Sequence, residues 1–479
     1  MTDLATDVLI VGAGVVGTAI ARTLAQYELT CAIVEAGNDV GAGTSKANTA
    51  ILHTGFDAVP GTVESRLVRR GAELLRGYAR QAGIPVERTG ALLIAWTTEQ
   101  AAQLSQIEHK ARQNGYLAAS QVPASEVYRR EPHLGPGALA ALDIPDESII
   151  CPWTTPLAYA TEALRAGVRI ELDTRVLGVD VGAGPDRQHV VRTSSGIRRC
   201  RWLINTAGLE SDDIDAMFGG AEFTIAPRRG ELIVFDKLAR PLVNSILLPV
   251  PTQQTKGVLI APTVYGNVLL GPTAQDVTSR SDTTTTAAGL ASLLDAGRRI
   301  MPDLVEEEVT ATYAGLRAAT QHRDYQIRVD AAQRYACAGG IRSTGLTASL
   351  GIAEYITGEL GEAGLELRER PAGPPPVMPY IGQAGIRPYQ DRQLIAADAA
   401  YGEIVCHCER VTRGEIRDAL ASDLPPADAD GLRRRTRTMN GRCQGFFCAA
   451  RVAQLTAAAG SPDMLTLEAA RAERSEMRA

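Results

Sequence analysis

The sequence predicts a mixed α/β and α+β architecture in three parts: a Rossmann-like nucleotide-binding domain, an antiparallel-sheet domain inserted into it, and a small C-terminal module. The chain begins with a buried strand, a glycine-rich turn and a helix. The pattern changes to short strands with turns between residues 223 and 313, and a cluster of cysteines lies near the C-terminus. A length of 479 residues also suits two or three domains better than one.

The first strand and turn carry the pattern of a dinucleotide site. Gly12 permits the tight turn, Gly14 lets backbone N–H groups approach a pyrophosphate, and Gly17 allows the following helix to pack close to the strand. Glu35 ends the second predicted strand, where a carboxylate accepts hydrogen bonds from a ribose. A glycine turn with a structural glutamate is the alternative. The complete strand–turn–helix context favours a dinucleotide.

Composition and charge exclude several classes of protein. Hydrophobic residues make up 45% of the chain and charged residues 22%, as in globular proteins with an ample core. The net charge of −6 argues against binding to nucleic acid or to an acidic membrane surface. The apolar runs have the length of strands, and the N-terminus lacks an export signal. We therefore expect a cytoplasmic protein without a membrane span, which reaches a membrane only through a partner.

The segment after Glu35 has the composition of a backbone that lies against a ligand. Small residues, hydroxyls and an amide crowd residues 41–57. Within it, Thr44, Ser45 and Asn48 offer hydrogen bonds to a phosphate, a sugar chain or a ring edge. An ordinary surface loop is the alternative.

Further along, the chain alternates between the two larger domains. Hydrophobic periodicity predicts helices over residues 62–83, 98–114 and 124–130, and strands over 91–96, 168–173, 176–181, 189–193, 230–235, 257–262 and 267–271. The strands between 168 and 193 suggest a small antiparallel unit. A buried strand ending at Ala207 and Gly208, and a strand, glycine turn and helix over residues 335–356, fit a return to the nucleotide-binding sheet.

These patterns divide the chain into discontinuous domains. The nucleotide-binding domain is expected to take residues 1–85, 151–222 and 326–368, the inserted domain residues 86–150 and 223–325, the proline-rich linker residues 369–400, the cysteine-bearing module residues 401–460 and a tail residues 461–479.

Four of the eight cysteines, Cys406, Cys408, Cys443 and Cys448, fall within 43 residues and indicate a metal or redox site. One residue separates the first two, 34 residues follow, and four residues separate the last two. Structural zinc sites usually space their ligands differently, so the spacing favours a [2Fe–2S] cluster, with zinc as the alternative.

The other charged and sulfur-bearing features have simpler interpretations. The isolated Cys31, Cys151, Cys200 and Cys337 are expected to be small buried residues. We interpret the basic run over residues 433–437 as a solvated face, with a docking surface for an acidic partner as the alternative.

Several stretches resemble the FAD-dependent glycerol-3-phosphate dehydrogenases of the D-amino-acid-oxidase-like superfamily, and the related L-2-hydroxyglutarate oxidases share part of the pattern. The matching stretches are residues 44–57, 227–231, 255–267 and 271–274. Residues 406–416 and 433–448 are similar to the end of the anaerobic large subunit, a [2Fe–2S] domain of the bacterioferritin-associated-ferredoxin (BFD) type. The resemblance implies FAD and a [2Fe–2S] cluster as cofactors. The FAD contacts expected are Gly12, Gly14, Gly17, Glu35, Thr44, Ser45, Asn48, Ala207, Gly208, Gly340, Gly345, Leu346 and Thr347.

Substrate chemistry is expected at two residues. His53 is the candidate base that removes the proton of the substrate hydroxyl, because the ordinary pKa of histidine is near neutral. The alternative is that His53 packs in the core or contacts the flavin. Covalent attachment of the flavin to His53 is not expected. The resemblance places Arg317 at the anionic group of the substrate, where a guanidinium grips a carboxylate or phosphate; a surface salt bridge is the alternative.

Three further cations are weaker candidates for the substrate anion. Lys256 and Arg229 are two of them. The third is Arg342, which stands where members of the similar family commonly have an acidic residue beside the flavin. This added positive charge leaves open whether the substrate is glycerol 3-phosphate.

These features predict a dehydrogenase that oxidises a small anionic hydroxy compound, with glycerol 3-phosphate (to dihydroxyacetone phosphate) the first choice. Electrons would pass through FAD and the [2Fe–2S] cluster to a partner subunit or a quinone-linked acceptor. The alternatives are a flavin enzyme of a 2-hydroxy acid such as L-2-hydroxyglutarate, or of an amino acid or opine, and a non-catalytic electron-transfer subunit.

Overall fold

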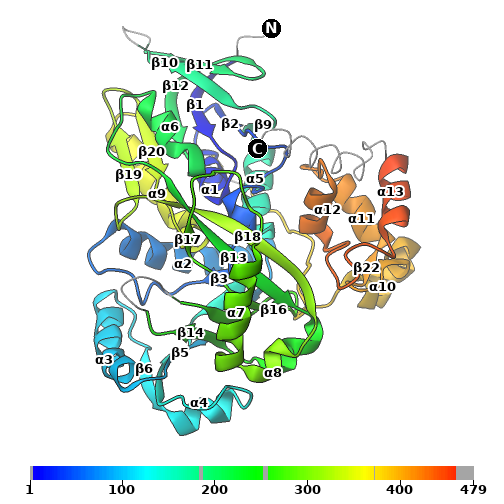
Figure 1. The fold of residues 1–479 in the computed structure, drawn as a ribbon. Helices are drawn as coiled ribbons and strands as arrows, with labels where there is room; N and C mark the ends of the chain where they lie inside the picture. The colour runs from blue at the N-terminus through cyan, green and yellow to red at the C-terminus, as the bar shows by residue number, and fades with distance from the viewer. Residues whose placement is uncertain (1–3, 183–186, 252–256, 372, 460–479) are drawn as a thin grey trace.

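The computed structural model describes residues 4–182, 187–251, 257–371 and 373–459. Two large sheets with their helices form the main body, and the C-terminal module lies beside it (Figure 1). Within the described ranges, no helix combines the length and apolarity needed to cross a membrane. The predicted mixed α/β and α+β fold class is confirmed.

The first sheet is the nucleotide-binding one, in the order β10-β11-β12-β1-β2-β9, with β20 paired to the second half of β12 and β19 to β20. Val8 and Ile10 of β1 face one core while Leu9 and Val11 face another, because alternate residues point to opposite sides of a strand. Both faces are therefore covered, as a parallel sheet requires. Its strands are β1 (Leu4–Val11), β2 (Cys31–Val34), β9 (Arg169–Glu171), β10 (Val176–Asp180), β11 (His189–Thr193), β12 (Gly196–Asn205), β19 (Gln326–Asp330) and β20 (Tyr335–Gly339).

Helix α9 packs between α1 and α2 on one face of this sheet. The approach of α9 to α2 depends on glycine: a Cβ at Gly71 would lie 2.3 Å from the Thr347 carbonyl oxygen, and one at Gly351 would lie 2.5 Å from that of Leu67. The first residues of α9 are thereby held against the body of the domain. The helices of this domain are α1 (Val15–Leu24), α2 (Val63–Ala82), α5 (Thr154–Arg165), α6 (Ser211–Ala216) and α9 (Gly345–Glu362).

One predicted strand belongs elsewhere than expected. The strand over 168–173 was assigned to a small antiparallel unit, but β9 pairs parallel with β2 at the edge of the first sheet. Only β10 and β11 form the antiparallel extension, against the first half of β12. Short strands of similar composition cannot be assigned to a neighbour from their sequence alone.

The second sheet has the order β17-β13-β16-β15-β14-β5-β7-β6, and β18 pairs along the whole of β13. The long β13–β18 ribbon crosses the front of the molecule in Figure 1. The strands are β5 (Ala91–Ala95), β6 (Ser120–Pro123), β7 (Ala140–Ile144), β13 (Ala226–Phe235), β14 (Ile246–Pro249), β15 (Leu259–Pro262), β16 (Val268–Gly271), β17 (Gln275–Asp276) and β18 (Val309–Ala319), and the helices α3 (Thr98–Gln113), α4 (Ala124–Arg130), α7 (Ala287–Ile300) and α8 (Pro302–Val305).

A small third sheet joins the two domains. It has the order β3-β8-β4, where β3 is Ile51–Leu52, β8 is Ser148–Ile150 and β4 is Val86–Glu87. The antiparallel pairing of β3 with β8 sets Leu52 opposite Ser148. The residues that follow β3 therefore lie beside those that precede β8.

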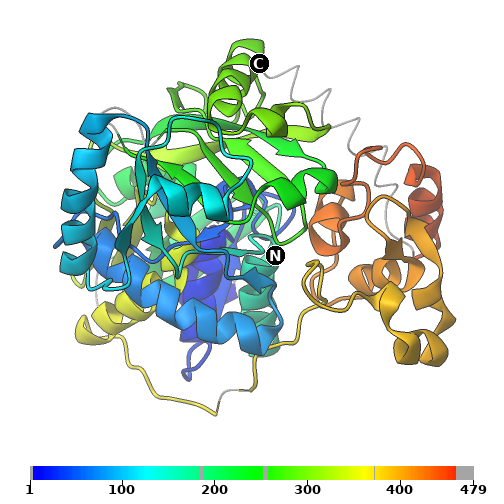
Figure 2. The ribbon, with the colours of Figure 1, turned by 90° about the horizontal axis from the view of Figure 1, so that it is seen from below.

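The C-terminal module has its own apolar core and is joined to the main body by an extended linker (Figure 2). Its elements are α10 (Arg392–Ala397), β21 (Ile404–Cys406), β22 (Val411–Thr412), α11 (Arg413–Leu420), α12 (Ala429–Thr436) and α13 (Ala449–Ala458). Thr412 and Glu415 form a reciprocal capping box at the start of α11, and Arg437 ends α12 in the left-handed conformation.

Candidate functional site

The glycine turn between β1 and α1 forms an open cradle at the N-terminus of a helix. A Cβ at Gly12, whose φ is +104°, would lie 2.6 Å from the Thr206 carbonyl oxygen, and one at Gly17 would lie 2.0 Å from that of Gly12. At Gly14 an added Cβ would meet only the Ser45 hydroxyl, at 3.3 Å. Two glycines thus serve close packing, while Gly14 leaves its backbone accessible, as a bound pyrophosphate requires.

Glu35 and Ser45 complete the cradle. The Glu35 carboxylate accepts hydrogen bonds from the amides of Ala13 and Gly37, both at 2.7 Å, so it lies beside the turn at the end of β2. The Ser45 hydroxyl accepts from the Val15 amide at 3.0 Å, at the first turn of α1. A carboxylate at the ribose position and a hydroxyl at the helix N-terminus fit the diphosphate and ribose of a dinucleotide.

The other predicted cofactor residues fall into two groups. Ala207 and Gly208 lie two and three residues after the end of β12, and the turn and first residues of α9 contain Gly340, Gly345, Leu346 and Thr347. Thr347 is in contact with the ligand-facing segment, because its hydroxyl accepts from the His53 amide at 3.0 Å. In contrast, Thr44 donates to the Leu316 carbonyl, and the Asn48 amide bonds within its own turn. These two side chains hold the segment in place.

His53 stands against a buried carboxylate that the sequence did not single out. Its Nδ1 lies 3.2 Å from Oε2 of Glu147, whose side chain is fully buried. The other Glu147 oxygen accepts from the amide and the hydroxyl of Thr54, at 2.7 and 2.9 Å, which fixes the carboxylate. A carboxylate at Nδ1 requires the proton on that nitrogen and leaves Nε2 as the basic atom, the arrangement of a general base. The pairing of β3 with β8 brings the two residues together.

Arg317 lies on the β13–β18 ribbon with no counter-charge. Its guanidinium donates to the Thr273 carbonyl at 3.1 Å, and no carboxylate among the described residues lies within ion-pair distance of it. Burial, aided by the charge of Arg228 across the ribbon, lowers the pKa of Arg317 to about 10. A half-buried arginine without an acidic partner has the charge and the donors to bind an anion.

The ribbon packs directly on the segment that leads to His53. A Cβ at Gly315 would lie 2.3 Å from the Ala47 carbonyl oxygen, and the Tyr313 hydroxyl donates to the Asn48 carbonyl at 2.7 Å. Tyr313, Gly315 and Arg317 share one face of β18, because they alternate along the strand. The structure thus brings the face that carries Arg317 against the segment that carries His53.

The weaker substrate candidates are not brought to this place. Arg229 lies on the opposite face of the ribbon, where its guanidinium bonds with Asp282 at 3.2 Å and Gln275 at 2.8 Å. Arg342 is tied to the Arg323 carbonyl and lies 3.6 Å from Glu64. Lys256 lies outside the described residues.

The four clustered cysteines face one another as two pairs. Cys406 is hydrogen bonded to Cys448, which lowers the pKa of the Cys406 thiol to about 6, and Cys408 is hydrogen bonded to Cys443. Among the described residues, no three or more Cys, His, Asp or Glu side chains surround a point as ligands of one metal ion would. Two pairs fit a cluster with two iron atoms, each held by two thiolates. The isolated Cys31, Cys151, Cys200 and Cys337 are buried, as predicted.

The basic run is a buried contact within the chain, so its interpretation as a solvated face is wrong. Arg434 donates to the Asp39 carboxylate at 2.6 Å, and Arg435 binds the same carboxylate through two nitrogens at 2.7 and 2.8 Å. Asp39 belongs to the nucleotide-binding domain and is 1% exposed. The arginines gain a counter-charge from a segment far away in the sequence, which charge patterning along the chain cannot reveal.

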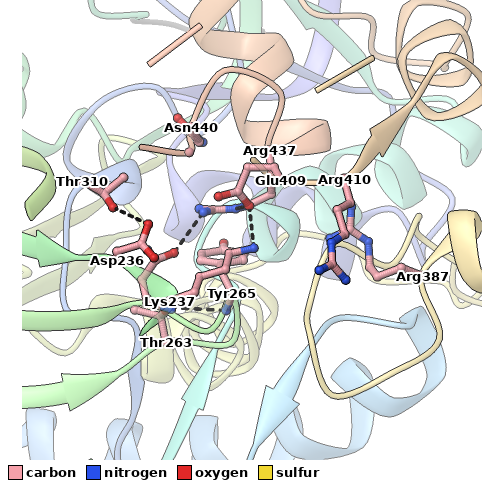
Figure 3. Close-up of polar contacts among 12 residues, drawn as sticks. Asp236, Lys237, Thr263, Tyr265, Thr310, Arg387, Glu409, Arg410, Arg437 and Asn440 are labelled. Carbon is pink, nitrogen blue, oxygen red and sulfur yellow. Dashed lines mark hydrogen bonds and ion pairs between the residues drawn. The ribbon is translucent and has the colours of Figure 1, made fainter. Parts of the chain in front are cut away.

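Arg437 extends this contact to the antiparallel-sheet domain. It bonds with Glu409 at 3.1 Å and with the Asn267 side-chain oxygen at 3.0 Å, and its guanidinium lies 4.2 Å from the centre of the Tyr265 ring (Figure 3). Lys46, two residues before Asn48, adds an exposed ion pair with Asp430 at 2.8 Å. The module is therefore fixed against both larger domains by buried, charge-assisted contacts.

Two family models match separate parts of the chain. The family model described as FAD dependent oxidoreductase matches residues 7–358, and that of the BFD-like [2Fe-2S] binding domain matches residues 404–458. A glycerol 3-phosphate dehydrogenase from Caloramator mitchellensis is 32% identical over 464 residues, which cover 96% of each chain. A glycerol 3-phosphate oxidase from Mycoplasma pneumoniae is 29% identical over 72% of this chain and 91% of that protein. The solved structure of reduced L-α-glycerophosphate oxidase from Mycoplasma pneumoniae with FAD bound superposes with a TM-score of 0.72 at 27% identity, covering 77% of this chain and 97% of that one.

Proposed function

Because the chain belongs to the FAD-dependent oxidoreductase family and carries a BFD-like [2Fe–2S] binding domain, we propose that it is a dehydrogenase of glycerol 3-phosphate. The oxidation would yield dihydroxyacetone phosphate. Electrons would leave through the cysteine module to a partner subunit or a quinone-linked acceptor. The Caloramator relative, similar over 96% of both chains, supports this substrate.

Arg317 is the observation that carries the proposal. Among the described residues its guanidinium has one hydrogen-bond acceptor, the Thr273 carbonyl at 3.1 Å, so its remaining N–H groups can bind the phosphate of the substrate. A phosphate with its two charges would restore the pKa that burial and Arg228 lower. We infer that Arg317 binds the substrate anion and orients the carbon that bears the hydroxyl.

The His53–Glu147 pair would take the hydroxyl proton. Glu147 holds the Nδ1 side of the ring at 3.2 Å, so the proton would go to Nε2, and the buried carboxylate would stabilise the imidazolium that results. FAD, when bound, supplies the two-electron acceptor, and the [2Fe–2S] cluster supplies a one-electron exit. The residues of the glycine cradle and of the α9 turn would hold FAD, and the four paired cysteines would hold the cluster.

The test is anaerobic bleaching of the flavin by a panel of substrates, with the holoenzyme and an Arg317→Met variant. Glycerol 3-phosphate is expected to bleach the flavin of the wild type at low concentration, and that of the variant only at much higher concentration. L-2-hydroxyglutarate, proline and an opine serve as the competing substrates. Bleaching by one of these and not by glycerol 3-phosphate would overturn the substrate. Bleaching by none would favour a non-catalytic electron-transfer subunit.

A further inference from the structure

Four cations gather where the linker, the antiparallel-sheet domain and the C-terminal module meet. We call them the junction cluster: Lys237 from the main body, Arg387 from the linker, and Arg410 and Arg437 from the module (Figure 3). None of them belongs to the candidate active site around His53 and Arg317.

Arg387 is the most deeply buried side chain of the junction cluster. It is 1% exposed, and its Nη2 donates to Glu415 at 3.0 Å. Its Nε and Nη1 are also buried, and no residue in the described ranges accepts a hydrogen bond from them. Buried N–H groups of a charged side chain are costly to leave without an acceptor. These two groups therefore indicate an acceptor that the described residues do not supply.

The carboxylates beside the junction cluster already accept hydrogen bonds from other groups. Glu409 pairs with Lys237 at 2.9 Å and with Arg437 at 3.1 Å. Glu415 accepts from the amide and the hydroxyl of Thr412, at 2.8 and 2.9 Å, in the capping box of α11. Within the part of the chain that the structure describes, the ion pairs of the four cations involve these two carboxylates, so positive charge is in excess.

The excess positive charge of the junction cluster affects the pKa of Lys237. Burial lowers the pKa of Lys237. Glu409 opposes this shift, and the charges of Arg437 and Arg387 lower the pKa further. These cations therefore lie close enough to repel one another, which the binding of an anion would relieve.

Arg410 marks the side of the cluster that faces solvent. It is exposed, has a φ of +52°, and donates to the Tyr389 hydroxyl at 3.0 Å. Its guanidinium lies 5.6 Å from the centre of the Tyr389 ring, so it lies over the short segment that begins at Arg387. Arg410 therefore contributes an exposed guanidinium beside the segment that follows the buried Arg387.

We propose that Arg387, Arg410 and Lys237 bind a phosphate group, either as free phosphate or as a phosphate monoester. Two guanidinium groups suit a tetrahedral oxyanion because each offers a planar pair of donors, and an ammonium adds a further charge. The bound anion would join Arg387 of the linker to Arg410 of the module, and Arg410 lies two residues after Cys408 in the chain. The proposal does not depend on the substrate of the active site.

The test measures the melting temperature of the holoenzyme against phosphate concentration, at constant ionic strength kept with chloride. An Arg317→Met background removes phosphate binding at the candidate active site, so failure here and failure of the proposed substrate are distinguishable. Inorganic phosphate is expected to raise the melting temperature with saturation, because it binds the folded state. Tighter binding of AMP than of phosphate would identify a monoester, and equal binding would identify the free anion; both support the site.

Two variants and a control decide the assignment. Arg410→Gln, at an exposed position, is expected to weaken phosphate binding about tenfold, the effect of one charged hydrogen bond. Arg387→Met is expected to abolish it, and if that variant does not fold, Arg410→Gln decides alone. Arg413→Gln is the control, since Arg413 pairs with Glu403 at 2.6 Å outside the cluster, and it should bind phosphate as the wild type does. Equal affinity in Arg410→Gln and the wild type, or no saturable effect of phosphate, would overturn the proposal.

Discussion

Replacing Asp39 with asparagine tests how the cysteine module is held against the nucleotide-binding domain. The Asp39 carboxylate accepts three short hydrogen bonds from Arg434 and Arg435, between 2.6 and 2.8 Å, and all three side chains are buried. The substitution would leave two buried guanidinium groups without this carboxylate. Removing one partner of a buried ion pair typically costs about 3–5 kcal/mol.

We expect the lower end of this range. Arg434 keeps its ion pair with Asp430, and Arg435 keeps hydrogen bonds to the carbonyls of Leu424 and Gly431. A loss of about 3 kcal/mol weakens docking of the module by a factor of roughly 100. The variant should therefore release the module for a larger share of the time, with the domains themselves still folded.

The assay is limited proteolysis of the linker in the holoenzyme, together with the rate at which the cluster is reduced after substrate is added. Asp39→Asn should be cut faster and should reduce its cluster more slowly, at unchanged FAD content. Asp423→Asn is the matched control: Asp423 also pairs across domains, with Arg165 at 2.7 Å, but both side chains are exposed, so about 0–1 kcal/mol is expected. Wild-type behaviour of Asp39→Asn in both measurements would refute the reasoning.

Four further predictions follow from the site and the module. Arg317→Lys keeps the charge but loses the planar pair of donors, so KM for the anionic substrate should rise by about tenfold or more in steady-state assays. Glu147→Gln should slow flavin reduction about 100-fold, measured by stopped flow, with little change in substrate affinity. The reason is that the carboxylate no longer holds the His53 proton on Nδ1 and no longer stabilises the imidazolium. Cys406→Ser should lose the iron and its absorbance while substrate still bleaches the flavin. Burial raises the pKa values of Asp39 and Glu409, but their basic partners outweigh it and hold both below their ordinary values. Docking is therefore fully stable above about pH 5 and is lost as the pH falls through the lowered values, which proteolysis against pH would show.

The parts of the site that are local in sequence were predictable. The cradle of Gly12, Gly14 and Gly17 requires only a strand, a turn and a helix in succession, and Glu35 follows from the spacing to the next strand. The cysteines are readable from their spacing for the same reason. The fold class followed because each domain has a hydrophobic period of its own.

The remaining parts depend on contacts between distant segments. Glu147 looks like any acidic turn residue until β8 pairs with β3 and sets it beside His53. Arg229 and Arg317 were both candidates for the anion, and only the pairing of β13 with β18 shows that they lie on opposite faces of the ribbon. The charges near Arg434 suggested solvent because Asp39, its partner, lies almost four hundred residues away.

The most direct test of the proposed function is a single-turnover experiment without oxygen, in which glycerol 3-phosphate is mixed with dilute holoenzyme and both cofactors are followed. Bleaching of the flavin and then reduction of the [2Fe–2S] cluster, recorded by absorbance and by electron paramagnetic resonance, is expected. The rate of cluster reduction should not depend on protein concentration, because the module is fixed to the same chain by Asp39 and Glu409. A flavin that glycerol 3-phosphate leaves oxidised, or a cluster that stays oxidised beside a bleached flavin, would contradict the account.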